Sequence, residues 1–387
     1  MKILIWSDAP WVNTGYGGQV RELCRRLPEM GHEVAVCALF GLQGAALNWR
    51  NVTVYPRWEG ELGEDVVGYY ARHFDADVVL SLYDVWALPR QVRQTLPCPW
   101  VAWVPVDGAP LSPEQVAILK TVDYPVAISR FGQREMDKAD VACDYIPLGI
   151  DTDVFRPGDK EAARAFLGIP QDRYMVAVVA SNKGYPPRKG WPEMMTAYTR
   201  FWEDHPEALL YLHTTRHPRG SRGIGVYFEA LFDALDLPQE AYTYVPEGAL
   251  AVGVPDATMA AVYQASDVML LPSMGEGFGL PVVEAQACGC PVITQDCSAM
   301  SELTVNGIAV KPLQPLWLPQ LKYWWQLPDV EAVTQALETV YSLAPSRESW
   351  YVKSAQGVEF VRSRYAWDVV MEQYWGPGLE RVEATLW

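Results

Sequence analysis

The chain has 387 residues, with 47 acidic and 31 basic side chains, a formal net charge of −16 and a hydrophobic share of 50%. A chain of this length is expected to form two domains, each with an ample core. The negative charge argues against a broad nucleic-acid or anionic-membrane surface, because both attract a positive face. No apolar run is long enough to span a membrane and Met1 leads directly into a predicted strand, so a cytoplasmic location is expected.

Metal and disulfide frameworks are not expected. Seven cysteines are an odd number without paired zinc spacing, so free buried thiols are predicted. His213 and His217 are four residues apart, but Pro218 and the glycines after it indicate a loop, and no acid completes a zinc site.

The chain opens with a predicted βαβ unit. Residues 2–6 and 33–39 read as buried strands, and a helix is predicted from about residue 19 to residue 30. The glycine-rich string TGYGG, residues 14–18, leads into that helix. Its spacing differs from the G-x-G-x-x-G of dinucleotide folds, which disfavours a nicotinamide cofactor.

Strand-like and helical stretches then alternate, which predicts a doubly wound parallel sheet. The strands are predicted at residues 52–55, 78–82, 100–104, 126–128 and 145–146, and the helices at 62–74 and 129–138. Asp107 follows the run at 100–104, where a carboxylate would meet a substrate hydroxyl, although Asp-Gly is also a common turn.

Residues 146–159, IPLGIDTDVFRPGD, are rich in Pro, Gly and Asp and lack helix or strand periodicity. This composition is typical of a linker between domains. The sequence therefore predicts a first domain at residues 1–150 and a second domain that starts at residue 151.

The second domain opens with a helix at 161–167, closed by Gly168, and a strand at 175–180. The loop SNKGYPPRKG follows, and then a helix from residue 191 to about 202. Lys183, Arg188 and Lys189 thus gather between a strand end and a helix start. Three cations there would hold a diphosphate and stabilise it as a leaving group, the alternative being an ordinary surface cluster.

The remaining elements of this domain are less regular. Strands are predicted at 209–213 and 242–245, helices at 226–235, 256–265 with Asp256 as cap, 329–343, 348–364 and 365–374, and a loop at 246–255. Residues 311–328 form a tryptophan- and proline-rich insert without regular periodicity, interpreted as an acceptor-side flap or a covering loop.

The most informative stretch lies at residues 268–294. A buried strand at 268–271 is followed by glycines at 275, 277 and 279, a helix from 281 to about 288 closed by Gly289, and a strand at 291–294. A strand, a glycine-rich turn and a helix start form a phosphate site, because free N–H groups and the helix dipole face the ligand. Glu276 in the turn and Glu284 one turn inside the helix could each accept two hydrogen bonds from a sugar diol.

The string EGFGLPVVEAQACGCPVI at 276–293, with IPLGIDTDVFRP at 146–157, resembles the retaining glycosyltransferase family 4, also called glycosyl transferases group 1. The resemblance implies an α/β protein of the GT-B fold, with two Rossmann-like, doubly wound domains facing a central cleft. It further implies that residues 151–364 bind the nucleotide sugar, and that residues 365–387 form a helix crossing back onto the acceptor-side domain 1–150.

Site roles follow from the same resemblance. Glu276 would lie against the donor sugar and Glu284 would bind the ribose. Lys189 matches the family's lysine, whereas the arginine position falls on Lys183, with Arg188 in reserve. Further donor contacts would come from Gly17, Gly18, Gly275, Gly277, Phe278, Gly279 and Leu280. Tyr16 and Asp107 would face the acceptor; Val106 and Asp107 stand near where the family often has a histidine.

The implied reaction moves a hexose from a UDP-, GDP- or ADP-linked donor to a hydroxyl of a glycan, lipid or small molecule, with retention of configuration and without metal. The departing phosphate oxygen would take the acceptor proton. Other possibilities are a phosphorylase or epimerase, a non-catalytic nucleotide-sugar binder, and a viral-type glycosyltransferase acting on a modified DNA base.

Overall fold

The computed structural model describes residues 1–218, 224–343 and 347–385. The chain divides into two compact units. Unit 1 comprises Met1–Gly149, Leu318–Tyr323 and Asp368–Trp387, and unit 2 comprises Ile150–Trp317 and Trp324–Trp367. The predicted first domain comprised residues 1–150 and 365–387. The prediction therefore differs from unit 1 by a few residues at each boundary, and it did not include residues 318–323.

Unit 1 is built on an eight-stranded sheet in the order β3-β4-β2-β1-β5-β6-β7-β8. Its strands are β1 (Lys2–Ser7), β2 (Glu33–Ala38), β3 (Leu47–Trp49), β4 (Val52–Pro56), β5 (Val78–Leu82), β6 (Trp100–Val104), β7 (Tyr124–Ala127) and β8 (Asp144–Tyr145). Only the edge strand β3 is antiparallel to its neighbour. The strand order reverses between β1 and β5, and ligands of open α/β sheets bind at such a switch point, outside the strand carboxyl ends.

The helical elements of unit 1 are α1 (Gly15–Glu29), α2 (Val67–Phe74), η1 (Val85–Ala87), α3 (Val92–Thr95), α4 (Pro113–Leu119), α5 (Arg130–Lys138), the π-helical segment η3 (Met371–Trp375) and α16 (Gly376–Ala384). Helix α1 begins at Gly15, so the prediction of a start near residue 19 was wrong. Thr14 caps it by accepting from the Gly17 N–H at 2.9 Å. A Cβ on Gly17 would lie 2.2 Å from the Val12 carbonyl oxygen, so only glycine fits this first turn.

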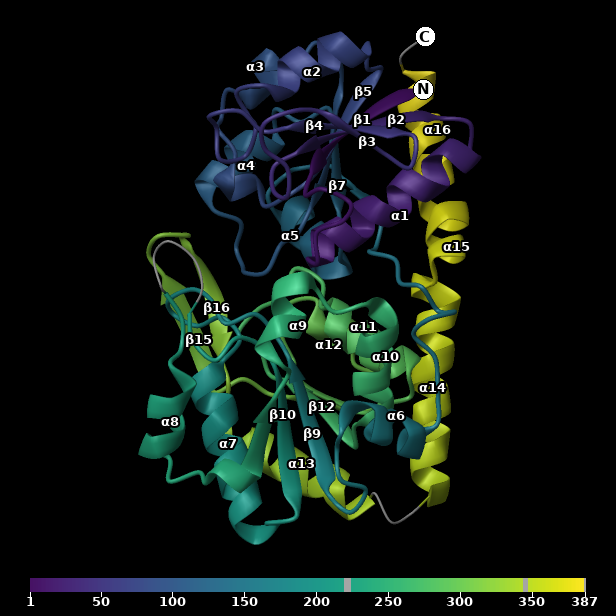
Figure 1. Ribbon diagram of the computed structural model, residues 1–387. Helices are drawn as coiled ribbons and strands as arrows, with labels where there is room; N and C mark the ends of the chain where they lie inside the picture. The colour runs from purple at the N-terminus through teal and green to yellow at the C-terminus, as the bar shows by residue number, and fades with distance from the viewer. Residues whose placement is uncertain (219–223, 344–346, 386–387) are drawn as a thin grey trace. The chain divides into compact units, whose positions relative to one another are not determined.

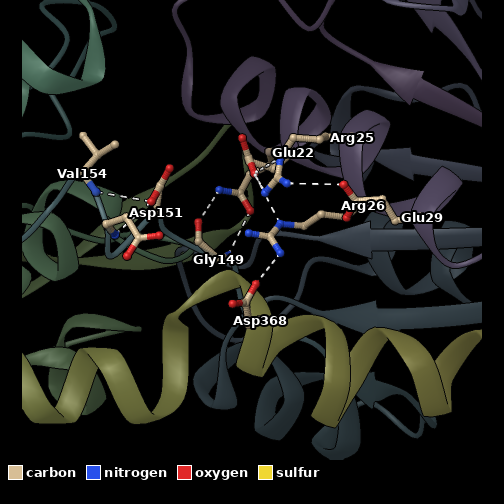
Figure 2. Close-up of polar contacts among 10 residues, drawn as sticks. Glu22, Arg25, Arg26, Glu29, Gly149, Asp151, Val154 and Asp368 are labelled. Carbon is tan, nitrogen blue, oxygen red and sulfur yellow. Dashed lines mark hydrogen bonds and ion pairs between the residues drawn. The ribbon is translucent and has the colours of Figure 1, made fainter.

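The returning end of the chain packs on unit 1. The rings of Trp103 and Trp375 meet edge to face at 4.9 Å, and Arg26 Nη1 lies 2.5 Å from Asp368 Oδ1 (Figure 2). The predicted last helix at 365–374 was too short, because the chain stays helical through α16. Pro377 lies in the first turn of α16, where a missing N–H breaks no helical bond. Residues 386–387 of the predicted crossing helix lie outside the described residues.

One buried side chain, that of Gln19, holds the backbone of Gly149 at the end of the first segment of unit 1. Gln19 donates from Nε2 to the Gly149 carbonyl at 2.8 Å and accepts from the Gly149 N–H at 3.0 Å. Beyond the boundary, Asp151 Oδ1 accepts from the N–H groups of Asp153 at 3.0 Å and Val154 at 3.3 Å (Figure 2). The Asp-rich linker therefore forms a local turn, which is the usual role of an Asp side chain in a loop.

Unit 2 contains a second parallel sheet, in the order β11-β10-β9-β12-β13-β14, and a two-stranded sheet, β15-β16. The strands are β9 (Tyr174–Val179), β10 (Ala208–His213), β11 (Tyr242–Tyr244), β12 (Val268–Leu271), β13 (Val292–Gln295), β14 (Ile308–Val310), β15 (Gln314–Leu318) and β16 (Tyr323–Leu327). The strand order reverses between β9 and β12, which places a second switch point there.

Helices cover both faces of this sheet, with α7, α8 and α13 on one side and α6, α10, α11 and α14 on the other (Figure 1). The helical elements are α6 (Lys160–Leu167), α7 (Trp191–Asp204), α8 (Phe228–Ala234), η2 (Gln239–Ala241), α9 (Glu247–Val252), α10 (Asp256–Ala265), α11 (Leu280–Ala287), α12 (Met300–Leu303), α13 (Val330–Leu343) and α14 (Arg347–Tyr365), followed by the short α15 (Trp367–Val370). Trp191, Tyr198 and Phe201 of α7 are fully buried in the core.

Two predictions in unit 2 were wrong. The segment 246–255 is not a continuous loop, because α9 lies within it. Asp256 is the first residue of α10 rather than its cap, which is Pro255. The insert 311–328, for which the sequence predicted no strands, contains the hairpin β15–β16, in which Tyr323 and Trp325 are buried and Trp324 is exposed. This alternation covers too few residues, among too many prolines, to stand out in the sequence. The hairpin does not decide between an acceptor-side flap and a covering loop.

All seven cysteines are free thiols, as predicted, but only five are buried, because Cys98 and Cys143 are partly exposed. Within the described residues, no helix is both long and apolar enough to cross a bilayer.

Candidate active site

Two loops of unit 2 leave adjacent strands at the switch point. One follows β9 and runs through residues 180–190 to α7, and the other follows β12 and runs through residues 272–279 to α11. Strands β9 and β12 pair directly, with Val268 opposite Val176. The two loops, about ninety residues apart in sequence, therefore emerge side by side at the position where this sheet type binds ligands.

Gly190 fixes the end of the first loop. It has φ +65° and ψ +35°, and a Cβ there would lie 2.9 Å from Pro328 Cγ and 3.1 Å from the Pro272 carbonyl oxygen. Only glycine meets both demands without strain. The Met274 N–H donates to the Arg188 carbonyl at 2.8 Å, which ties the two loops together. The Lys-Gly pair of the sequence thus holds Lys189 against the glycine-rich turn.

The side chains of the two loops meet at Glu276. Arg188 Nη1 lies 2.8 Å from Glu276 Oε2, and Lys189 Nζ pairs with Glu276 Oε1. Arg188 also donates to the Gly275 carbonyl. The carboxylate is 7% exposed and the Lys189 side chain 13% exposed, so these charges are largely removed from water. Two cations thus face one anion in this cluster.

The pKa values at this cluster follow from burial and from the two cations. Burial would raise the pKa of Glu276, but the charges of Arg188 and Lys189 outweigh it and lower the pKa to about 2. Burial lowers the pKa of Lys189 from its ordinary value, and Glu276 opposes that shift. A ligand that brings further negative charge to Lys189 would favour its protonated form.

Helix α11 directs its first N–H groups toward the same region. Its cap is Gly279, with φ +123°, and Pro281 lies in its first turn without an N–H to leave unpaired. Among the described residues, no side chain caps this end. Val282 and Val283 donate their N–H groups to the Gly279 carbonyl, so the N–H of Leu280 and the helix dipole are what this end offers an anion. Phe278 is buried with its ring edge-to-face on Tyr365 at 5.5 Å, and Leu280 opens the helix.

Glu284 lies one turn inside α11. Tyr263 of α10 donates its hydroxyl to Glu284 Oε2 at 2.7 Å. Burial and the nearby Asp256 raise the pKa of Glu284 to about 7, although the Tyr263 hydroxyl acts in the opposite direction. The carboxyl is thus balanced between its neutral and ionised forms near neutral pH, where a diol would favour the ionised form.

The other predicted site residues lie in the first loop of unit 2 and in unit 1. Lys183 is exposed in the first loop, so Arg188, the predicted reserve, is the arginine on Glu276. In unit 1, Gly17 and Gly18 lie in the first turn of α1, and Tyr16 donates to Asp84 Oδ2 at 3.4 Å. Asp107 accepts from the Tyr323 hydroxyl at 2.9 Å.

Two residues of the site were not predicted. Ser298 Oγ accepts from the Glu276 N–H at 2.9 Å and so orients the turn, and Tyr263 holds Glu284. Ser298 follows β13, the strand beside β12, so the rule that strand carboxyl ends share one edge could have identified it. Tyr263 left no sequence signal, because its contact depends on how α10 packs against α11. Among the described residues, no three His, Cys, Asp or Glu side chains gather in a way that could hold a metal ion.

Two doubly wound units and a phosphate-type turn beside a cationic loop define a protein of the GT-B fold. Solved structures agree on the fold: sucrose-phosphate synthase from Thermosynechococcus elongatus matches with a TM-score of 0.77, at 20% identity over 99% of both chains. The Anabaena protein HepE, solved in complex with UDP and glucose, matches with a TM-score of 0.67, at 16% identity over 96% of this chain and 98% of that one. The predicted fold class is confirmed.

The family resemblance is confirmed as well. Residues 239–321 match the family model Glycosyl transferases group 1, a segment that contains both Glu276 and Glu284. D-inositol 3-phosphate glycosyltransferase from Segniliparus rotundus is 33% identical over 175 residues, and the Mycobacterium leprae protein of the same name is 32% identical over 169. These alignments cover 44% and 43% of this chain, but the chain spans only 36% and 35% of the relatives' lengths.

Proposed function

We propose that this protein transfers a hexose from a nucleotide diphosphate sugar to an acceptor hydroxyl, with retention of configuration and without a divalent metal. The observation that carries the proposal is the convergence of Arg188 and Lys189 on buried Glu276, beside the uncapped start of α11. The match of residues 239–321 to group 1 glycosyltransferases supports it.

The donor's diphosphate would bind to unit 2 at the switch point. Its negative charge exceeds that of one carboxylate, so it can attract both cations even while Glu276 remains paired. The N–H of Leu280 and the dipole of α11 add a second source of positive potential. Exposed Lys183 is free to turn toward the same phosphates, which is the role proposed for it.

The hard step is departure of the diphosphate from the anomeric carbon. As the C1–O bond breaks, negative charge grows on the phosphate, and each preorganised cation can lower the barrier by roughly 3 kcal/mol. Lys189 is the main candidate, because burial keeps water from screening its charge. Glu276 would accept hydrogen bonds from the donor sugar, and Glu284 from the two ribose hydroxyls.

Retention follows if the acceptor oxygen attacks the face that the diphosphate leaves. The new C1–O bond then forms as the old one breaks, and the acceptor proton passes to the departing phosphate oxygen. The reaction therefore needs no separate base from the protein.

The test supplies UDP-, GDP- and ADP-glucose and -mannose to the purified protein with a mixed panel of hydroxyl acceptors. Transfer with an α-linked product from an α-linked donor, unchanged by EDTA, is expected, and NMR reads the anomeric configuration. An inverted product or loss of activity with EDTA would contradict the corresponding part of the proposal. Release of sugar only with inorganic phosphate would identify a phosphorylase, and isomerised donor an epimerase.

A further inference from the structure

The carboxyl edge of the unit 1 sheet carries large aromatic side chains in contact with solvent. Phe40 follows β2, Trp58 follows β4 and Trp86 follows β5, and they are 59%, 67% and 48% exposed. Single exposed apolar residues are common on protein surfaces, but three rings on loops from the same sheet edge form a group. We call these three residues the aromatic rim. Aromatic rings of this kind supply rigid contact area at little entropic cost.

The loops that carry the rim are built by specific contacts. The Ala9 N–H donates to the Phe40 carbonyl at 2.9 Å, and Trp11 Nε1 donates to the Gly41 carbonyl at 3.1 Å. Gly41 has φ +95°, and a Cβ there would lie 2.2 Å from Val12 Cγ2. The loop after β1 and the loop after β2 are therefore packed backbone to backbone, which fixes Phe40 without burying its ring.

The same loops are strongly acidic. The loops at this edge span residues 8–14, 39–46, 57–66, 83–91 and 105–112. They contain seven acids and two bases, namely Asp8, Glu59, Glu61, Glu64, Asp65, Asp84 and Asp107, with Arg57 and Arg90. This charge repels phosphorylated ligands. Carboxylates accept hydrogen bonds in pairs, so they suit a ligand rich in hydroxyl groups.

The rim is longer than a single sugar ring. Trp58 follows β4 and Trp86 follows β5, and in the order β4-β2-β1-β5 these two strands are separated by three interstrand distances. Neighbouring strands lie about 4.8 Å apart, so the two rings start from positions roughly 14 Å apart along the edge.

From these observations, and resting on the proposed function, we infer that the acceptor is an uncharged glycan of several sugar residues. Its rings stack on Phe40, Trp58 and Trp86, and its hydroxyl groups donate to the exposed carboxylates of Glu59 and Glu61, which follow Trp58 in the same loop. A phosphorylated acceptor, such as the one for which the curated relatives are named, does not suit this edge.

The test measures binding of maltohexaose, cellohexaose and chitohexaose, with inositol 3-phosphate and glucose 6-phosphate as the charged comparison, by calorimetry and saturation-transfer NMR. At least one hexasaccharide is expected to bind at least tenfold more tightly than either phosphate. Trp58→Ala and Trp86→Ala should each weaken it tenfold or more. Tyr69→Ala is the matched control, because Tyr69 is 61% exposed in the same unit but lies on α2, away from the edge.

Preference for a phosphorylated ligand, failure of all three hexasaccharides to bind, or equal affinity of the tryptophan variants and the parent would overturn the inference. Circular dichroism checks that each variant is folded. Nucleotide sugar binding is measured separately on the same samples. If nucleotide sugars bind and hexasaccharides do not, only the acceptor inference fails; if hexasaccharides bind and nucleotide sugars do not, the proposed transfer fails instead.

Discussion

Arg188 Nη1 lies 2.8 Å from Glu276 Oε2, although 88 positions separate these residues in the sequence. Lys189, the next residue, pairs with the other oxygen of the same carboxylate. One buried acid thus orders two cations before any ligand arrives, and each prediction below tests a consequence of that arrangement or of the acid that follows it in α11.

Removing the Lys189 ammonium is expected to reduce turnover more than donor binding. Lys189→Ala should lower kcat by about a hundredfold or more, the usual effect of losing one preorganised charge on a leaving group. Steady-state kinetics with saturating donor measures this. Arg200→Ala is the control, because Arg200 is an exposed arginine of the same unit that pairs with the exposed Glu331. A Lys189→Ala enzyme as fast as the parent would remove the leaving-group role.

Glu276 should stabilise the fold above acidic pH. Its pKa is about 2 in the folded protein and ordinary, near 4.5, in the unfolded chain. The stabilisation is therefore fully present above about pH 4.5 and is lost as the pH falls toward 2. The shift corresponds to at most about 3 kcal/mol. Urea unfolding should give a large difference in the free energy of unfolding between the parent and Glu276→Gln at pH 7, and a smaller difference at pH 3. A difference that does not change with pH would contradict the ion-pair account.

Glu284 should act on stability in the opposite sense. Its folded pKa, about 7, exceeds the ordinary carboxyl value, so the folded state holds a proton that the unfolded state has lost. Stability from this group is full below about pH 4.5 and falls as the pH rises through 7. Glu284→Gln should therefore raise the melting temperature relative to the parent at pH 8 and have little effect at pH 4.5. Equal shifts at both pH values would show that Glu284 does not titrate in this range.

Because the pKa of Glu284 is about 7, the affinity for the donor is expected to depend on pH. A ribose diol donates to an ionised carboxylate, so binding of a nucleotide sugar should strengthen from pH 6 to pH 8 and release a proton. A nucleotide sugar is the right probe, because its diphosphate diester has no ionisation near neutral pH. Calorimetry in two buffers of different ionisation enthalpy measures the proton. Glu284→Gln should bind more weakly and without pH dependence.

A substitution at Gly190 tests whether the backbone conformation there positions the Lys189 side chain. Gly190→Ala introduces a Cβ at positive φ and against Pro328 and Pro272, so it should destabilise unit 2 by about 2 kcal/mol and weaken donor binding. Gly168 has a similar φ of +69° but open space around it, so Gly168→Ala should cost only about 1 kcal/mol and leave binding unchanged. Equal effects of the two substitutions would show that strain, rather than close approach, sets the cost.

The sequence predicted local structure well where a single local feature, such as an apolar run or a glycine at a helix end, marks an element. The bounds of β6 and β12 match the predictions, and Gly168 closes α6 as predicted. The pairing of Glu276 with Arg188 and Lys189 could not be read in this way, because it depends on β9 and β12 becoming neighbours in the sheet order. The family pattern favoured Lys183 over Arg188, and only the path of the loop to Gly190 decides which side chain reaches the acid.

The central claim is that unit 2 holds a diphosphate between Lys189, Arg188 and the start of α11. A crystal structure with bound nucleoside diphosphate tests it most directly. We predict a phosphate oxygen within hydrogen-bonding distance of Lys189 Nζ and of the first N–H groups of α11, with both ribose hydroxyls on Glu284. A nucleotide bound elsewhere, with no phosphate oxygen within hydrogen-bonding distance of Arg188 or Lys189, would contradict the account.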